Sequence, residues 1–275
     1  MLAAALACVA AVLVGYGLLS HTLPAAPPEP MGSVTTTASC PDLGGQGRID
    51  ATHPSGASIT LCTHGGHLVS WKTASDDEML YVSPTAVYGP PKAIRGGVPI
   101  CFPQFGKKGP ITAQHGFARN SPWAMVGSTV SDSATTVTMQ LTKETLRTAG
   151  DTADCPEWPH DFTLQITYAI NATSLKMTAE VRAPTEGFEM GLLFHTYLRV
   201  GDIKQTEITG LQSLSYFPNG AGDSATPTLE KLDNGEDTLV EQRDVSDFPL
   251  FLLHFTPRLL HFTLFNSVPS ALVRL

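Results

Sequence analysis

Two neighbouring stretches, 162-FTLQITYAI-170 and 175-LKMTAEV-181, decide the fold class. In both, every second side chain is apolar, and the alternating set consists of Phe162, Leu164, Ile166, Tyr168, Ile170, Leu175, Met177, Ala179 and Val181. A period of two predicts strands with one buried face. The intervening residues Asn171–Ser174 (NATS) predict a hairpin turn that joins the two strands.

The same pattern extends outward from this hairpin. Val137–Leu141 (VTMQL) alternates in the same way, and only Lys143–Ala149 (KETLRTA) has the character of a short helix. Strands and helices do not alternate along the chain, as they would in a protein with a parallel sheet. We therefore expect an all-β protein of antiparallel strands, either a sandwich or a barrel.

Composition limits the function classes. The chain has 275 residues, of which 42% are hydrophobic and 15% charged, so it can form a sizeable core in one large domain or two small ones. Its net charge of −8 argues against a nucleic-acid-binding protein, which normally carries a basic patch. A local basic pocket for an anionic ligand remains compatible with this charge.

The N-terminal stretch differs in composition from the rest. Met1–Ser20 is almost wholly apolar and carries no charged side chain, and about 20 such residues can span a membrane. We expect residues 1–22 to be a hydrophobic anchor or targeting segment, although a wrongly extended start would give the same sequence. Residues 23–47 are expected to form a Pro/Ser/Thr/Gly-rich linker.

The cysteines do not form a recognisable framework. Their number is odd, no pair has the CxxC spacing, and they lie at Cys8, Cys40, Cys62, Cys101 and Cys155. This pattern is typical neither of a disulfide scaffold nor of a zinc site. We expect isolated buried or free thiols.

Three stretches carry polar side chains in an unusual setting. In 190-MGLLFHTYLRV-200, a predicted strand places His195, Tyr197 and Arg199 on one face, which either lines a polar site or meets solvent. In 114-QHGFARNSPW-123, a turn around a glycine can direct Gln114 and Arg119 toward one point. In 93-AIRGGVPICFPQFG-106, Arg95 is the only charged residue of a stiff, apolar stretch.

The stretch 64-HGGHLVSW-71 contains two histidines. No cysteine or carboxylate completes a ligand set at the right spacing, and a metal site needs three or four donors. We therefore interpret it as a glycine-rich bend before a strand, and no metal is expected.

Taken together, these stretches resemble the hexose-6-phosphate mutarotases, or glucose-6-phosphate 1-epimerases, of the aldose-1-epimerase-like group. The resemblance covers about Ala51 to Phe248 and implies one β-sandwich domain, galactose-mutarotase-like, over residues 48–248. It implies an isomerase that interconverts the α and β anomers of a hexose 6-phosphate by acid–base ring opening. It also implies a shallow sugar cleft, a monomer, no organic cofactor or metal, and a cytoplasmic location; the N-terminal segment would instead imply a membrane anchor or an organelle.

The resemblance also assigns site residues. His195 matches the catalytic acid, and histidine suits proton transfer near neutral pH. Arg95, Gln114 and Arg119 match ligand-binding positions, where the arginines would hold the 6-phosphate. His115 is expected either to contact the sugar or to be structural.

The sequence departs from the family pattern near its end. The family's base is a late glutamate, whereas residues 249–275 contain no Asp or Glu and the last acid is Asp247. We expect the closing strands of the sandwich to be missing, either because the gene product is truncated or misread or because a genuine shortened protein has an apolar tail that packs somewhere or touches a membrane. The alternative function is an inactive sugar-phosphate-binding module. A third is a membrane-tethered carbohydrate-binding domain, suggested by the N-terminal segment and the sequon Asn171–Thr173.

Overall fold

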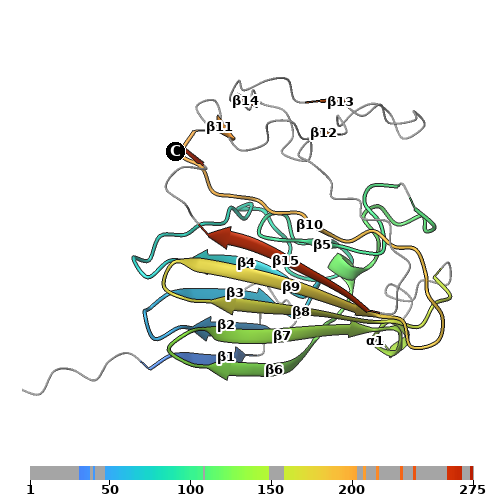
Figure 1. Cartoon of the computed structure of the whole chain (residues 1–275), viewed down its shortest axis with the longest axis horizontal. Helices are drawn as coiled ribbons and strands as arrows, with labels where there is room; N and C mark the ends of the chain where they lie inside the picture. Colours follow the sequence, from blue (N-terminus) through green and yellow to red (C-terminus); the bar gives the residue numbers. More distant parts are fainter. Residues whose placement is uncertain are drawn as a thin grey trace, which may run out of the picture.

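The structure is a computed structural model of the whole chain (Figure 1). It describes residues 31–37, 40, 47–107, 109–148 and 158–202, together with the backbone of short strands farther along. The predicted anchor over residues 1–22 lies outside the described residues, as do Cys8 and Cys155. Within the described part, no helix is both long and apolar enough to cross a membrane.

The first sheet has four antiparallel strands in chain order. They are β1 (Ser33–Thr37), β2 (Arg48–Thr52), β3 (Ser58–Cys62) and β4 (His67–Lys72). β1 lies inside the segment expected to be a linker, and its threonines and valine are residues that favour extended backbone. The domain boundaries themselves remain predictions.

The second sheet has five antiparallel strands. In spatial order they are β15 (Leu259–Ser267), β9 (Ser174–Arg182), β8 (Thr163–Ile170), β7 (Thr135–Thr142) and β6 (Ala124–Val130). The predicted hairpin is confirmed, since β8 and β9 pair across Asn171–Ser174. The predicted helix is also confirmed as α1 (Lys143–Thr148). β15, within the apolar tail, pairs along the outer edge of β9.

The two sheets bury their apolar faces in one shared core. Its members include Ile49, Ile59, Leu61 and Trp71 from the first sheet and Val137, Leu164, Ile166, Tyr168 and Met177 from the second. Every alternating apolar residue predicted for β8 and β9 is buried. Aligned or stacked sheets that share a core make a β-sandwich, so the all-β antiparallel prediction is confirmed.

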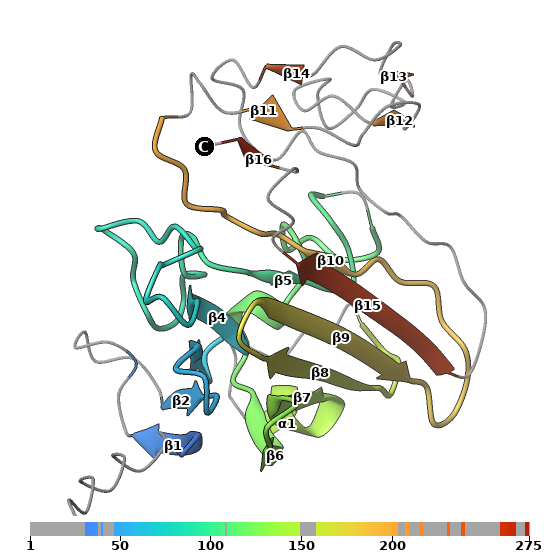
Figure 2. The same ribbon diagram turned by 60° about the vertical axis from the view of Figure 1, so that its left-hand side comes forward.

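Shorter elements complete the described chain. β5 (Ile100–Cys101) pairs with β10 (Leu193–Phe194), and this pair lies next to β4 in both views (Figures 1 and 2). A 3-10 turn, η1, spans Ala118–Asn120. Farther along are β11 (Glu207–Ile208), β12 (Ser215–Tyr216), β13 (Glu230–Lys231), β14 (Thr238–Leu239) and β16 (Val273–Arg274).

The continuous strand predicted over Met190–Val200 was wrong. Only Leu193–Phe194 forms a strand, and the rest is extended backbone that runs along the segment containing Arg95. His195 N donates to the Pro99 carbonyl at 2.9 Å, and Gly191 N donates to the Pro103 carbonyl at 2.6 Å. Prolines have no N–H to return, so a regular ladder cannot form here.

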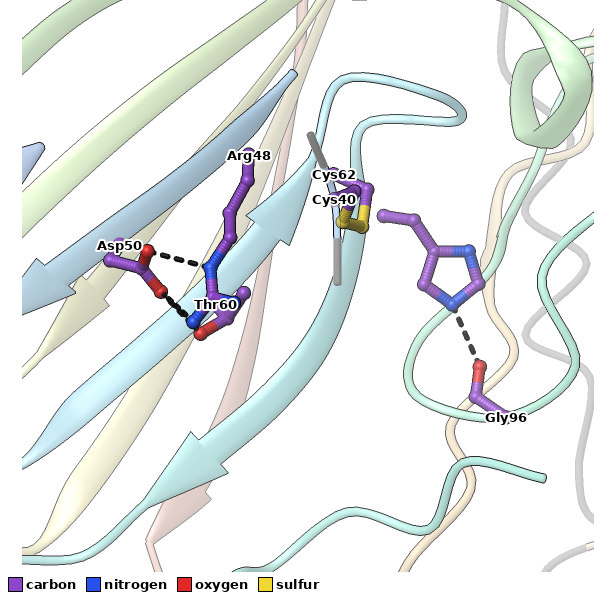
Figure 3. The surroundings of a disulfide bond; sticks show 7 residues. Cys40, Arg48, Asp50, Thr60, Cys62 and Gly96 are labelled. Atoms are coloured by element: carbon purple, nitrogen blue, oxygen red, sulfur yellow. Dashed lines mark hydrogen bonds and ion pairs between the residues drawn. A yellow bond between two sulfur atoms is a disulfide. The ribbon is translucent and has the colours of Figure 1, made fainter. Parts of the chain in front are cut away.

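The cysteine prediction also needs correction. Cys40 and Cys62 form a disulfide with their Cα atoms 5.5 Å apart, within the usual range for such a bond (Figure 3). Both sulfurs are buried in a small apolar cluster that includes Ile94, next to Arg95 in the chain. Sequence spacing missed the bond because only the fold brings the end of β3 against residue 40. Cys101 is a buried free thiol, as expected.

Candidate functional site

Arg95 lies at a sharp bend between two buried segments. Ile94 on one side and the β5 residues on the other are almost completely buried, whereas the Arg95 side chain is exposed. Gly96 and Gly97 have φ of 111° and 61°, a region that side-chain-bearing residues rarely adopt. A Cβ at Gly97 would lie 2.2 Å from the Leu68 carbonyl oxygen. The two glycines therefore let the backbone turn tightly and present Arg95 outward.

Arg119 lies in η1 and is partly buried. Its Nη2 donates to the Gln114 backbone carbonyl at 2.9 Å. Its Nε is buried and has no hydrogen-bond partner among the described residues. The sequence indicated that a turn can direct Gln114 and Arg119 toward one point. In the structure Arg119 reaches the Gln114 main-chain carbonyl, and the Gln114 side chain is exposed.

The two histidines of the site lie against each other. The His115 and His195 rings are 5.6 Å apart between centroids and meet edge to face. Phe105 contacts both, at 4.6 Å from His115 and 6.1 Å from His195. Tyr197 stacks on His195 at 5.0 Å with an interplanar angle of 11°. Thus His195 and Tyr197 share one face, as the alternation predicted, although the segment is not a regular strand.

The backbone fixes which nitrogen of His115 carries the proton. His115 has φ of 66°, and its Nδ1 accepts a hydrogen bond from Gly106 N at 3.0 Å. Its own N–H donates to the Gly106 carbonyl at 2.7 Å. Nδ1 is therefore the acceptor, and the neutral ring carries its hydrogen on Nε2.

Gln104 holds the loop that carries Phe105, one of the rings in contact with the two site histidines. It is 2% exposed, and its amide bonds both the N–H and the carbonyl of Ile111, at 3.0 and 2.8 Å. These bonds close the loop that carries Phe105. The sequence did not indicate Gln104, because a glutamine next to a proline is not a pattern that predicts a buried side chain.

The site is electrostatically positive. Burial most strongly lowers the pKa of His115, with further lowering by Arg119, His195 and Arg95, and brings it to about 4. Burial, then Arg119 and Arg95, also lowers the pKa of His195. Among the described residues, the charges that act most strongly on these two rings are cationic. An anionic ligand would therefore be attracted here.

Cys101 lies close to Arg119 but is not a nucleophile. Burial raises the pKa of its thiol to about 12, and the nearby Arg119 charge only partly opposes this effect. A thiol with such a pKa is protonated at neutral pH, and only the thiolate is reactive. Cys101 therefore serves as a small apolar side chain beneath the site.

No group of three or more metal-ligating side chains exists among the described residues. The two histidines of the HGGH stretch instead bond backbone carbonyls: His64 Nε2 contacts Lys92 O at 2.8 Å and His67 Nε2 contacts Gly96 O at 2.7 Å. The glycine-rich bend predicted there is confirmed, since Gly65 and Gly66 have positive φ immediately before β4.

Residues 47–248 match the family model described as aldose 1-epimerase. The chain belongs to the aldose 1-epimerase family. The matched range contains both sheets apart from β1 and β15, and it contains Arg95, Gln114, His115, Arg119 and His195.

Individual members of the aldose 1-epimerase family match part of the chain. The chain is 36% identical over 160 residues to a protein of Cenchrus ciliaris provisionally named glucose-6-phosphate 1-epimerase, covering 57% of this chain and 48% of that protein. It is 36% identical over 170 residues to an Escherichia coli protein of the same provisional name, covering 59% and 52%. The chain thus spans about half the length of the curated relatives that it matches.

Solved structures show the same fold. A provisionally assigned mutarotase of Salmonella typhimurium superposes with a TM-score of 0.57 at 28% identity, over 73% of this chain and 61% of that one. A galactose mutarotase-like protein of Clostridium acetobutylicum superposes with a TM-score of 0.52 at 16% identity, over 68% and 61%. The galactose-mutarotase-like fold class predicted from sequence is confirmed.

Proposed function

We propose that this protein acts on the anomers of a hexose 6-phosphate, with Arg95 and Arg119 binding the phosphate and His195 serving as the general acid. The observation that carries the proposal is the cationic site itself. Two arginines act on two partly buried histidines that lie edge to face. A neutral sugar would not require this concentration of positive charge, whereas a phosphate dianion would.

The two arginines suit different parts of phosphate binding. Arg95 is exposed on a rigid bend and can meet the ligand from solvent. Arg119 has a buried Nε with no hydrogen-bond partner in the described part of the chain, a cost that a bound phosphate oxygen would offset. Guanidinium groups bind phosphate through paired, charge-assisted hydrogen bonds. The relatives' names support a phosphorylated hexose as the substrate.

The remaining residues are proposed to face the sugar. The stacked ring of Tyr197 and the tilted ring of Phe105 flank His195 and keep it from turning away. Nε2 of His115 carries the hydrogen and is left to donate to a sugar hydroxyl, because Nδ1 is occupied by Gly106 N. Gln114 contributes its exposed side chain from the adjacent position.

The proposed reaction needs one acid and one base. The base takes the proton from the anomeric hydroxyl, the electron pair forms the C1 carbonyl, the C1–O5 bond breaks, and the acid gives its proton to O5. Rotation about C1–C2 followed by ring closure, with the two roles exchanged, forms the other anomer. Such proton transfers contribute about 10²- to 10⁴-fold each to rate.

His195 must be protonated to act as the acid. Burial foremost, and then the charges of Arg119 and Arg95, oppose this because they lower the pKa of His195. A phosphate dianion bound to these arginines would offset their charge and raise that pKa. Substrate binding and acid formation are therefore linked in the proposed mechanism.

A second function is binding without turnover. It is favoured by one observation: the charges acting most strongly on His195 are cationic, and the described residues place no carboxylate among them to serve as the base. Under this alternative the chain binds a sugar phosphate through Arg95, Gln114 and Arg119. The predicted monomeric state bears on neither function and stays a prediction.

The test is a paired measurement on one preparation. Calorimetric titration with glucose 6-phosphate, and with glucose, reports binding, and NMR exchange spectroscopy between the two anomers of glucose 6-phosphate reports turnover. We expect binding of the phosphate ester that Arg119→Met weakens at least about tenfold, the cost of one charge-assisted contact. Arg48→Met, which removes an arginine paired with Asp50, is the matched control.

The outcomes separate the two functions. Binding with accelerated anomer exchange supports the isomerase. Binding without exchange supports the binding module. Equal affinity for glucose and glucose 6-phosphate, or no loss in Arg119→Met, would overturn the phosphate assignment common to both.

A further inference from the structure

The turn between β3 and β4 lies between the two arginine-bearing segments. We include in it Thr63–Gly66 and His67, the first residue of β4, so that it contains the complete HGGH motif, which the sequence predicted only to be a bend. None of its side chains belongs to the proposed substrate site. Its backbone and its two histidines nevertheless contact the segment that carries Arg95 and the segment that carries Arg119. These contacts indicate what the turn does.

Toward Arg95, the turn bonds the chain on both sides of that residue. His64 Nε2 donates to the Lys92 carbonyl at 2.8 Å, and His67 Nε2 donates to the Gly96 carbonyl at 2.7 Å. Because a carbonyl only accepts, each ring must carry its hydrogen on Nε2. Arg95 is therefore bracketed by two carbonyls held from the same turn.

Toward Arg119, the contact is made by backbone. Gly65 N donates to the Ser121 carbonyl at 2.7 Å, and Trp123 N donates to the Thr63 carbonyl at 2.8 Å. A Cβ on Gly65 would lie only 2.6 Å from the Arg119 carbonyl oxygen. The two backbone segments are in direct contact at this point, so a shift of the turn would move Arg119.

The second sheet holds the turn in place. The hydroxyl of Tyr168, a fully buried residue of β8, donates to the Gly66 carbonyl. Gly66 also packs so closely on the Trp123 ring that a Cβ there would lie 2.7 Å from it. The turn is thus a fixed part of the core rather than an adaptable loop.

We propose that this turn sets the relative positions of the two phosphate-binding arginines, with His67 as a positioning residue for substrate recognition. The inference rests on the proposed function, since it takes Arg95 and Arg119 as the phosphate ligands. His67 acts through Gly96, and it touches no reacting atom. A phosphate recognised by two guanidinium groups requires a defined spacing between them.

The state of His67 fits this role. It is fully buried, and its Nδ1 has no hydrogen-bond partner among the described residues. Burial foremost, with the charges of His64 and Arg119, lowers its pKa to about 4, opposed by the bond to Gly96. His67 is neutral at physiological pH, so it donates one hydrogen bond without adding charge beside Arg119.

The test compares two substitutions of His67 with a control. His67→Leu removes the donor to Gly96, whereas His67→Gln retains an amide N–H that reaches a similar position. His53→Leu is the control, because His53 is also a buried histidine, bonded to Ser55 Oγ at 2.8 Å and to the Asp132 carbonyl at 3.2 Å, with neither partner in the site. Calorimetric titration with glucose 6-phosphate is the readout.

We expect His67→Leu to raise the Kd about tenfold, His67→Gln to return it to within about threefold of wild type, and His53→Leu to leave it unchanged. A second readout, hydrogen exchange of the Gly97 amide, needs no ligand. That amide donates to the Tyr81 carbonyl at 2.7 Å, and its exchange should accelerate in His67→Leu but not in His53→Leu.

The two proposals fail in different ways. If wild type binds no glucose 6-phosphate but Gly97 exchange accelerates in His67→Leu, the ligand assignment fails and the positioning of this segment stands. If wild type binds and folded His67→Leu binds equally well, the positioning role is overturned. Equal loss of affinity in His53→Leu would show a general stability effect and would also overturn it.

Discussion

His115 and His195 meet edge to face, with ring centroids 5.6 Å apart. Positively charged arginines act on both rings, and both pKa values lie below the ordinary value of 6.5. Burial foremost, and then the cationic neighbours, therefore favour the neutral form of both imidazoles. The positive surroundings disfavour protonation of either ring, and a bound anion would make protonation easier.

The first prediction concerns the bound state. Glucose 6-phosphate should raise the pKa of both His115 and His195, because the phosphate offsets the arginine charges that contribute to lowering them. NMR titration of the imidazole resonances, with and without ligand, measures this. Glucose, which lacks the phosphate, is the control ligand and should leave both values unchanged. Unchanged values for both site histidines would contradict phosphate binding at these arginines.

The second prediction separates binding from proton transfer. In a preparation that exchanges anomers, His195→Gln should lower kcat at least about 100-fold, since the acid is lost. Its affinity for glucose 6-phosphate should change less than about threefold, because the arginines remain. His160→Gln is the matched control, since His160 packs against Trp158 and Phe188 instead. Retained turnover in His195→Gln would remove it as the acid.

The third prediction concerns acid stability. His67 has its pKa lowered by burial to about 4, against an ordinary 6.5. Between these values the unfolded chain binds a proton that the folded chain does not. The stabilisation is therefore complete above about pH 6.5 and is lost as the pH falls toward 4, by about 3 kcal/mol in total.

Urea unfolding at about pH 7 and pH 5 checks this for wild type and His67→Gln. The variant lacks the titrating ring, so its free energy of unfolding should fall less between the two pH values, by about 2 kcal/mol. Parallel losses in the two proteins would show that His67 is not the group responsible.

The fourth prediction concerns the glycine bend. Gly97→Ala should destabilise the protein by more than about 3 kcal/mol, since its Cβ would meet the Leu68 carbonyl oxygen at 2.2 Å. Gly106 has a similar φ of 60° but nothing within 4 Å of its Cβ position. Gly106→Ala should therefore cost only the backbone strain, about 1–2 kcal/mol. Thermal unfolding of both variants decides the point, and equal costs would mean that the close contact is absent.

The fifth prediction concerns the cysteines. Cys40 and Cys62 are separated by 22 residues, and closing a loop of this length by a disulfide stabilises a protein by about 3 kcal/mol in the chain-entropy model. Mass spectrometry after alkylation without reductant should find these two cysteines linked. Dithiothreitol should lower the melting temperature of wild type but not that of a Cys62→Ser variant. Alkylation of both cysteines in the native protein would contradict the bond.

Much of the fold followed from periodicity alone. The alternation in β7, β8 and β9 predicted both the strands and the residues that they bury, because a half-buried strand must place every second side chain in the core. The same rule misled over Met190–Val200, where side chains alternate but the partner segment contains prolines that cannot donate. Periodicity describes one strand, whereas a ladder depends on two.

The site residues illustrate the same limit. His195 and Arg119 stood out by residue type, the family resemblance added His115, and the fold brings the three together. The contribution of Gln104 and of the turn containing His67 depends on partners that are distant in the chain, such as Gly96. Residue type alone does not distinguish a buried histidine that bonds a carbonyl from one that transfers protons.

The sequence by itself determined the fold class, the hairpin of β8 and β9, and the short list of charged and titratable residues in apolar settings, because these depend on patterns within one segment. Only the tertiary structure decided that Cys40 meets Cys62, that Gln114 serves Arg119 through its carbonyl, and that His67 holds the chain beside Arg95. The physical reason is that hydrogen bonds and disulfides act over a few ångströms, and only the packing of two sheets on a common core brings residues far apart in the chain within that reach.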